Sequence, residues 1–327
     1  MKKNVLSFIA LGALLAGLFF ASVNSGSIRV SFLELLKGLF IEYNGSVAVI
    51  FDLRFPRIII AMLSGAALAV SGVFFQAVMR NPLADPGIIG ISSGASFAAV
   101  LVTMFFPSLF FFTPFFAFLG GLLAFTLVYS MSWKSGLSPL RIILVGIAVN
   151  AVFTGLMEGA NYMTGGKQSE IAAIVSANIS MKTWGDVNTL VWYVVLGLLA
   201  ALFMSGKCNL LSLEDKTVRN LGVNINAVRM LVSVIAVMLA GISTAVAGAI
   251  GFVGLIVPHI ARLLVGSNHK VLVPFSILLG SFTVLFADTA GRLIAAPYEI
   301  PASIIMAVIG GPFFIFLIRR SDKTYGN

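Results

Sequence analysis

The chain has 327 residues, of which 59% are hydrophobic and 10% are charged, and its mean hydropathy is +1.05. Surface area falls slowly relative to volume, so a soluble protein of this length cannot bury so much apolar surface. The net charge of +9 lies in loops without a basic stripe interleaved with aromatics, which excludes nucleic acid as a partner. The composition therefore predicts an all-α polytopic membrane protein surrounded by lipid.

Nine or ten apolar segments are long enough to cross about 30 Å of hydrocarbon. In chain order they are 5–23, 57–79, 88–107, 114–132, 141–161, 189–206, 228–249, 251–267, 271–291 and 303–319. The count stays open because 251–267 is short and contains Pro258. With ten spans, most of the 21 lysine and arginine residues fall on the side of both termini. The positive-inside rule thus favours ten spans with both termini cytoplasmic.

The N-terminal segment has a second interpretation. Lys2 and Lys3 precede an apolar run, as in a cleaved signal peptide, but Ala21 to Val23 would make a poor cleavage site. The run is also longer than a usual signal core. We therefore expect a retained first span and one transmembrane domain over 1–327.

Reactive side chains are few. The only cysteine, Cys208, excludes an internal disulfide, and the two histidines, His259 and His269, have no cysteine or carboxylate at ligand spacing. Walker, G-x-S-x-G and H-E-x-x-H motifs are absent. We expect no catalytic residue, no metal site and no cofactor bound by this chain.

Glycine spacing predicts close helix packing. Gly87, Gly90 and Gly94 would share one helix face, and Gly155 and Gly159 form a G-x-x-x-G pair. Small residues let helix backbones approach closely in lipid, where hydrophobicity cannot drive association. A tightly packed bundle follows.

The chain also contains an apparent internal repeat. The same spacing separates Arg57 from Pro86 and Arg229 from Pro258, and both intervening segments are rich in small residues. In the ten-span topology the second to fifth spans would be inverted relative to the seventh to tenth. Inverted repeats suit alternating access to a path through the membrane.

Motifs along nearly the whole chain resemble one family. They are Leu53-Arg-Phe-Pro-Arg57, Ser71-Gly72, Gln76, Asn81-Pro-Leu-Ala84, Pro86-Gly87, Gly90, Gly251 to His259, Arg262, Asp288, Arg292, Glu299-Ile-Pro301 and Gly310 to Phe313. This pattern is similar to the permease subunits of type II ABC importers for iron-siderophores, haem and cobalamin. The resemblance implies a ten-helix permease fold that dimerises with a second copy or a paralogue. It also implies two cytoplasmic ATPase subunits that bind ATP and Mg, and an extracytoplasmic binding protein that delivers cargo at the plasma membrane.

The resemblance also implies roles for single residues. Arg54, Arg57 and Arg292 would dock acidic side chains of the binding protein, as exposed guanidinium groups can. Ser138, Pro139 and Leu140 align with a cytoplasmic gate, which here would close by apolar contact.

The cytoplasmic segment 207–227 would couple to the ATPase. Leu213, Thr217 and Leu221 would lie on one face of a short helix, with Glu214 and Asp215 elsewhere and Gly222 as its C-cap. A short amphipathic helix is suited to a groove on a partner.

The outer segment 161–188 looks like that of haem-importing members from Gram-positive bacteria, which favours haem over a ferric siderophore, with cobalamin as an alternative. Glu158 and Asp288 are candidates for an ion-coupled secondary porter, but both lie near predicted outer span ends. Asp288 would pair more simply with Arg292 one turn away. A membrane enzyme would need a nucleophile or metal cluster that the sequence lacks.

Overall fold

The computed structural model describes residues 2–26, 28–132, 139–163, 174, 177, 179–295 and 298–325. Within these ranges every regular element is a helix. All ten predicted spans are helical: α1 (Lys2–Val23), α4 (Phe55–Val78), α5 (Ile91–Phe105), α6 (Thr113–Ser132), α7 (Pro139–Met163), α9 (Trp184–Cys208), α11 (Ile225–Ala247), α12 (Val253–Val265), α13 (His269–Ile294) and α14 (Ala302–Tyr325). Seven stretches are long and apolar enough to cross a membrane, and three further apolar helices are shorter.

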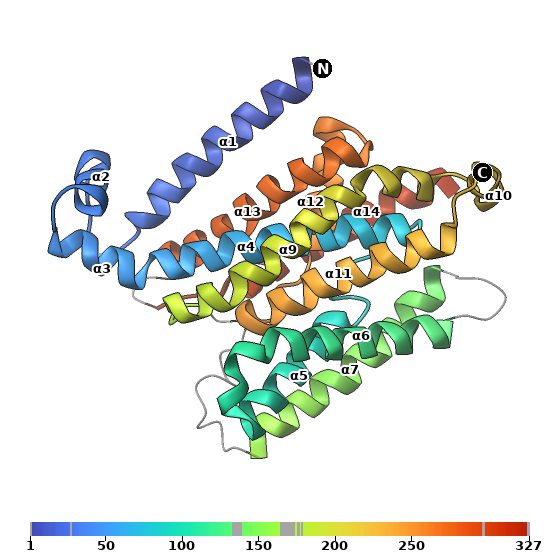
Figure 1. The fold of residues 1–327 in the computed structure, drawn as a ribbon, viewed down its shortest axis with the longest axis horizontal. Coiled ribbons are helices and arrows are strands. Elements are labelled where there is room, and N and C mark those ends of the chain that lie inside the picture. The colour runs from blue at the N-terminus through green and yellow to red at the C-terminus, as the bar shows by residue number, and fades with distance from the viewer. Residues whose placement is uncertain are drawn as a thin grey trace.

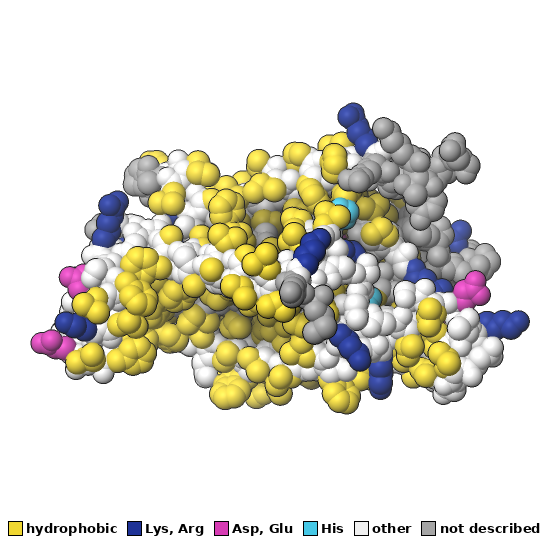
Figure 2. Space-filling view, turned by 90° about the horizontal axis from the view of Figure 1, so that it is seen from above, with side chains coloured by type: hydrophobic (Ala, Val, Ile, Leu, Met, Phe, Trp, Pro, Cys, Tyr) yellow, Lys and Arg dark blue, Asp and Glu magenta, His cyan; other side chains and the backbone are white. Residues whose placement is uncertain are grey.

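The helices form an elongated bundle with two distinct ends (Figure 1). One end carries α2 (Phe32–Phe40) and α3 (Gly45–Leu53), and the other carries α10 (Asp215–Asn220). We call them the α2 end and the α10 end. Figure 2 shows hydrophobic side chains across one long face, with the visible acidic side chains at the two ends. This distribution fits a bundle whose middle is surrounded by lipid.

Helix α4 is the centre of the bundle. In the stretch Gly45–Val78, which contains α4, 83% of the 18 most apolar consecutive residues are buried, compared with 17% in α1. Two glycines set its crossings: a Cβ on Gly72 would lie 2.0 Å from the Gly254 oxygen, and one on Gly65 would lie 2.1 Å from the Gly280 oxygen. Only glycine permits these backbone contacts with α12 and α13.

Two short helices begin at corresponding places in the two halves. α5 has 15 residues and α12 has 13, whereas the helices before them, α4 and α11, have 24 and 23. At about 1.5 Å per residue, α12 is roughly 20 Å long, short of about 30 Å of hydrocarbon. Each short helix follows a left-handed residue, Gly90 at φ 84° and Phe252 at φ 66°. The order of a long, a short and two long helices recurs, as expected for a repeat.

The prediction that Pro86 and Pro258 occupy equivalent positions in that repeat was wrong. Pro86 lies in the turn before α5, whereas Pro258 lies inside α12. The turn exists because the Asp85 carboxylate is buried and accepts hydrogen bonds from the backbone N–H groups of Gly87 and Ile88, at 2.8 and 3.3 Å. The link between α11 and α12 is shorter, so the two prolines are not equivalent.

Part of the glycine prediction was also wrong. Gly87 and Gly90 precede α5 and share no helix face with Gly94. Gly94 itself packs against α6, where its Cβ would lie 2.7 Å from the Gly120 oxygen. A Cβ on Gly155 or Gly159 would meet nothing within 4 Å, and both are exposed. That G-x-x-x-G pair faces away from the described part of the chain.

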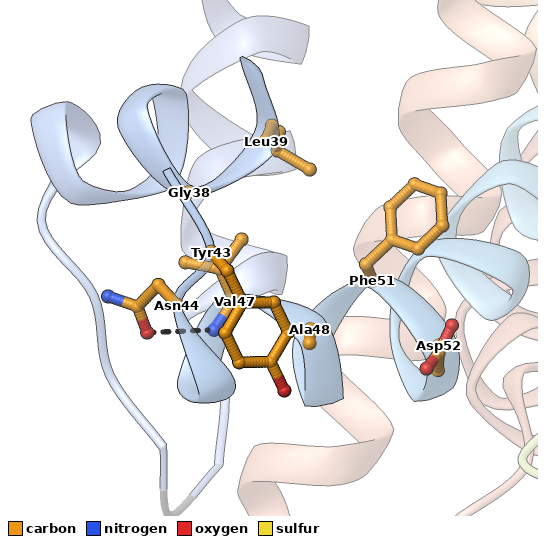
Figure 3. A pocket seen from close by; sticks show the side chains of 8 residues that line it. All are labelled: Gly38, Leu39, Tyr43, Asn44, Val47, Ala48, Phe51 and Asp52. Atoms are coloured by element: carbon orange, nitrogen blue, oxygen red, sulfur yellow. Dashed lines mark hydrogen bonds between the residues drawn. The ribbon is translucent and has the colours of Figure 1, made fainter. Parts of the chain in front are cut away.

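Two helices at the α2 end were not predicted. α2 begins with a capping box in which Ser31 and Glu34 bond reciprocally to each other's backbone N–H, and Asn44 caps α3. Figure 3 shows the cavity of about 210 Å³ between them, lined by residues that include Leu39, Tyr43 and Phe51. Each helix has 9 residues, too short to register as a span.

Candidate functional site

The α2 end holds a buried ion cluster around Asp288 on α13. Arg57, in the first turn of α4, donates from Nε to both Asp288 carboxylate oxygens, at 2.9 and 3.0 Å. Its Nη1 donates to Glu299 Oε2 at 2.7 Å. The side chains of Arg57 and Asp288 are 6% and 1% exposed, whereas that of Glu299 is 42% exposed. We call Arg57, Asp288, Arg292 and Glu299 the Asp288 cluster.

Arg292 supplies the second cation of this cluster. Its Nε lies 3.3 Å from Asp288 Oδ2, an ion pair without hydrogen-bond geometry, which agrees with the predicted pairing one turn apart. Its Nη2 donates to the Ser22 hydroxyl at 2.5 Å, which ties α13 to the end of α1. The Arg292 side chain is 8% exposed. Two of the three predicted docking arginines are therefore engaged inside the chain.

Arg54 is the most accessible of the three. It lies between α3 and α4, and its Nη1 donates to the carbonyl oxygens of Val23 and Ile28, at 2.5 and 2.8 Å. It is half-buried, and no ion pair involves it among the described residues. The structure thus places the three arginines at one end of the bundle, with Arg54 the one not neutralised by a carboxylate.

Glu299 precedes α14 and closes the cluster toward the surface. Burial raises the pKa of its carboxyl, but hydrogen bonds from Ser180 and Arg57, together with the charges of Arg57 and Arg292, outweigh burial and lower it overall. The carboxylate is therefore ionised at neutral pH. Asp288 and Glu299 together compensate the two buried guanidinium groups.

A second ion cluster lies at the α10 end, around Asp215. Arg229, in the first turns of α11, donates from Nη1 and Nη2 to the two Asp215 carboxylate oxygens, at 2.9 and 2.8 Å. Arg80, just after α4, donates from Nη2 to Asp215 Oδ1 at 2.7 Å. The side chains of Arg80, Asp215 and Arg229 are 42%, 35% and 22% exposed. We call these three residues the Asp215 cluster.

The predicted coupling segment is only partly helical. Within 207–227, η2 covers Asn209–Ser212 and α10 covers Asp215–Asn220. Leu213 and Glu214 are extended, and Leu221 follows the helix. The prediction that Leu213, Thr217 and Leu221 share one helix face was therefore wrong. The helix begins late because Arg80 holds the backbone of the preceding residues, donating to the Leu211 oxygen at 2.8 Å and to the Leu213 oxygen.

Most of the residues predicted to couple to the ATPase are exposed. Leu213 is 40% exposed and Leu221 is 62% exposed, while Glu214 and Thr217 are also exposed. Gly222 has φ 75° and follows the helix end, as the predicted C-cap requires. The sequence did not identify Arg80 or Arg229 as partners of this segment, because 135 and 14 residues separate them from Asp215.

The remaining predicted residues lie elsewhere. Ser138 is outside the described residues, and Pro139 and Leu140 are the first residues of α7, with side chains that are not described. The segment 161–188, which motivated the choice of haem, is described except for 164–173, 175, 176 and 178. Among the described residues no three His, Cys, Asp or Glu side chains gather as metal ligands. Cys208 is buried.

Comparisons with known proteins agree with this architecture. A family model described as the FecCD transport family matches residues 14–320. The protein named "Probable heme-iron transport system permease protein IsdF" is 40% identical in Staphylococcus aureus strains MSSA476 and Newman, over 99% of this chain and 98% of the relative.

Solved structures show the same fold. A metal-chelate type ABC transporter in an inward-facing conformation superposes with a TM-score of 0.79 and 33% identity, covering 95% of this chain and 98% of that one. PsaBC from Streptococcus pneumoniae, solved with a Fab, has a TM-score of 0.60 at 18% identity, covering 88% and 95%, and so supports the fold alone.

Proposed function

The chain is an ABC transporter permease of the FecCD transport family, and from that premise we propose that it carries haem inward across the plasma membrane, driven by ATP. The observation that carries this proposal is the 40% identity, over nearly the whole of both chains, to a permease named for heme-iron transport. A ferric siderophore is the second candidate, favoured by the likeness to a metal-chelate transporter. Cobalamin is a third cargo within the family that the sequence resembles.

The α10 end faces the cytoplasm in this proposal, and both chain termini lie there. A separate ATPase that binds ATP and Mg seats on the exposed residues around α10, namely Leu213, Glu214, Thr217, Leu221 and Gly222. A second permease, either a copy or a paralogue, completes the path. The exposed Gly155 and Gly159 face of α7 supports such a neighbour, because it has no packing partner in the described chain. The gate at Ser138, Pro139 and Leu140 stays a prediction.

The α2 end faces outward and receives a cargo-binding protein. Arg54 makes the first contact with an acidic side chain, since no carboxylate neutralises its charge in the described part of the chain. Arg57 and Arg292 lie behind it, paired with Asp288, and would support the docking end from inside the bundle. Arg54→Glu combined with Arg292→Glu should abolish stimulation of ATP hydrolysis by the binding protein, and unchanged stimulation would exclude these residues from the docking site.

Reconstitution tests the function directly. The permease is placed in vesicles alone, or with its ATPase and binding protein, and haem uptake is followed by absorbance. We expect ATP-dependent uptake from the complete complex and none from the permease alone. Uptake without ATP would instead establish a secondary porter. Competition with a ferric siderophore and with cobalamin distinguishes the three cargoes.

A further inference from the structure

Asp215 connects three separate parts of the chain: the exposed segment around α10, the end of α4 and the start of α11. We propose that the Asp215 cluster is a mechanical joint that passes movement of the α10 segment to α4 and α11. Asp215 is then a positioning residue that faces the bundle, not a contact for the ATPase. This inference rests on the proposed function, because it assigns the direction in which an ATPase acts.

Arg80 gives the joint its first arm. It has φ 48°, a left-handed conformation that is unfavourable for a residue with a Cβ. Its guanidinium group reaches the segment at three points, the carbonyl oxygens of Leu211 and Leu213 and the Asp215 carboxylate. These bonds hold the strained conformation, so displacing the segment displaces the end of α4 directly.

Arg229 gives the second arm. Its bidentate bond to Asp215 fixes the segment to the first turns of α11 with a defined orientation. Arg229 also lines a cavity of about 340 Å³, together with residues such as Val78, Tyr129 and Ser233. The cavity leaves room for the Arg229 side chain to swing while its helix moves.

The two arms end on helices that pack against each other. Ser71 on α4 donates to the Ala236 oxygen on α11 at 2.7 Å. These helices open the two halves of the repeat and are mostly buried, so they are the central pair of the bundle. A segment tied to both can shift them together, which no contact on α10 alone can do.

Exposure of the cluster suits a joint that changes during a cycle. Ion pairs at such exposed positions contribute little to stability, so they can break and re-form without unfolding the chain. A bistable element of this kind is what couples two distant sites.

The test uses the complete transporter with its ATPase and binding protein, carrying Asp215→Asn, Arg80→Gln or Arg229→Gln. Each variant should copurify with the ATPase and hydrolyse ATP, while cargo moved per ATP falls by about tenfold, within the usual range of allosteric coupling. Asp215→Glu should retain most of the coupling. Lys270→Gln, which removes an exposed charge at the start of α13, outside both clusters and away from the docking end, is the control.

The pattern across variants decides the assignment. In the joint, Asp215→Asn with Arg229→Gln should be no worse than Asp215→Asn alone, because Asp215→Asn already removes the ion pair that Arg229→Gln removes. Loss of ATPase copurification in Asp215→Asn but not in the arginine variants would instead make Asp215 a direct contact and overturn the proposal. Unchanged cargo per ATP in Asp215→Asn would also overturn it. Failure of the wild-type complex to take up cargo would refute the proposed function, whatever the variants do.

Discussion

The Asp288 and Asp215 clusters lie at opposite ends of α4 and its neighbours, and each has one aspartate between two arginines, to which the Asp288 cluster adds Glu299. They differ in burial: the Asp288 side chain is 1% exposed and that of Asp215 is 35% exposed. A charge withdrawn from water must be compensated fully, whereas a charge near water is screened by solvent. Ion pairs between aspartate and arginine are therefore expected to be fixed at the α2 end and able to break and re-form at the α10 end.

The strongest test of this contrast removes the buried carboxylate. Asp288→Ala leaves only Glu299 to compensate the two buried guanidinium groups of Arg57 and Arg292, and breaking a buried ion pair costs about 3–5 kcal/mol. We expect the free energy of unfolding in detergent to fall by that amount. Asp52→Ala, at an exposed position near the same end, is the control. Equal unfolding free energies for the two variants would show that the Asp288 cluster does not stabilise the fold.

The crossing of α4 with α12 lies between the two clusters. A substitution there should destabilise the fold nearly as much as Asp288→Ala does. In Gly72→Ala the new Cβ would lie 2.0 Å from the Gly254 oxygen, so the two backbones must separate. Overpacking of this kind costs about 1–3 kcal/mol. Gly155→Ala, whose Cβ meets nothing, should unfold like the wild type. A stable Gly72→Ala variant would mean that α4 moves easily relative to α12.

Glu299 tests an intermediate case, because it bonds the buried Arg57 but is itself 42% exposed. Glu299→Gln removes one of the two carboxylates that Arg57 contacts and leaves Asp288 in place. We expect a loss of about 1 kcal/mol in unfolding free energy, the usual value for one partly exposed bond to a charged group. A loss as large as that of Asp288→Ala would show that Glu299 is as essential as the buried partner.

Hydropathy was sufficient to predict the ten helices, since a membrane helix must satisfy its own backbone and be apolar throughout. It could not predict α2 and α3, whose 9-residue apolar runs are shorter than a span, although the pairing of Ser31 with Glu34 is a capping signal in the sequence. Nor could it place the start of α12, because Phe252 gives no hint of a left-handed conformation.

The candidate site was less predictable than the fold. Asp288 with Arg292 follows from helical spacing, but Arg57 with Asp288 joins residues 231 apart and depends on how α4 packs against α13. Likewise, the orientation of Asp215 toward the bundle follows from Arg80, which no local pattern links to it. Sequence identified residue types capable of ion pairing, and only tertiary packing determined the partners.

The smallest stability effect is expected for Asp215→Ala. At these exposures each of the two ion pairs contributes about 0–1 kcal/mol, so the free energy of unfolding in detergent should fall by less than in Asp288→Ala. The large effect of this variant should be on cargo moved per ATP. A destabilisation comparable to that of Asp288→Ala would remove the contrast between the clusters.

The pH dependence of transport tests the Asp215 cluster without unfolding the protein. Hydrogen bonding from Arg229 lowers the pKa of Asp215, burial opposes this shift, and the charges of Arg229 and Arg80 add to it. A carboxyl whose pKa is lowered in the folded state contributes its full stabilisation at pH values above its unfolded-state pKa of about 3.9. It loses this stabilisation as the pH falls through the folded-state pKa. The difference in cargo per ATP between wild type and Asp215→Asn should therefore stay constant from pH 8 to about 5, where the carboxylate remains ionised. A difference that titrates near neutral pH would mean that the Asp215 carboxylate is not held by the two arginines, and the joint would have to be sought elsewhere at the α10 end.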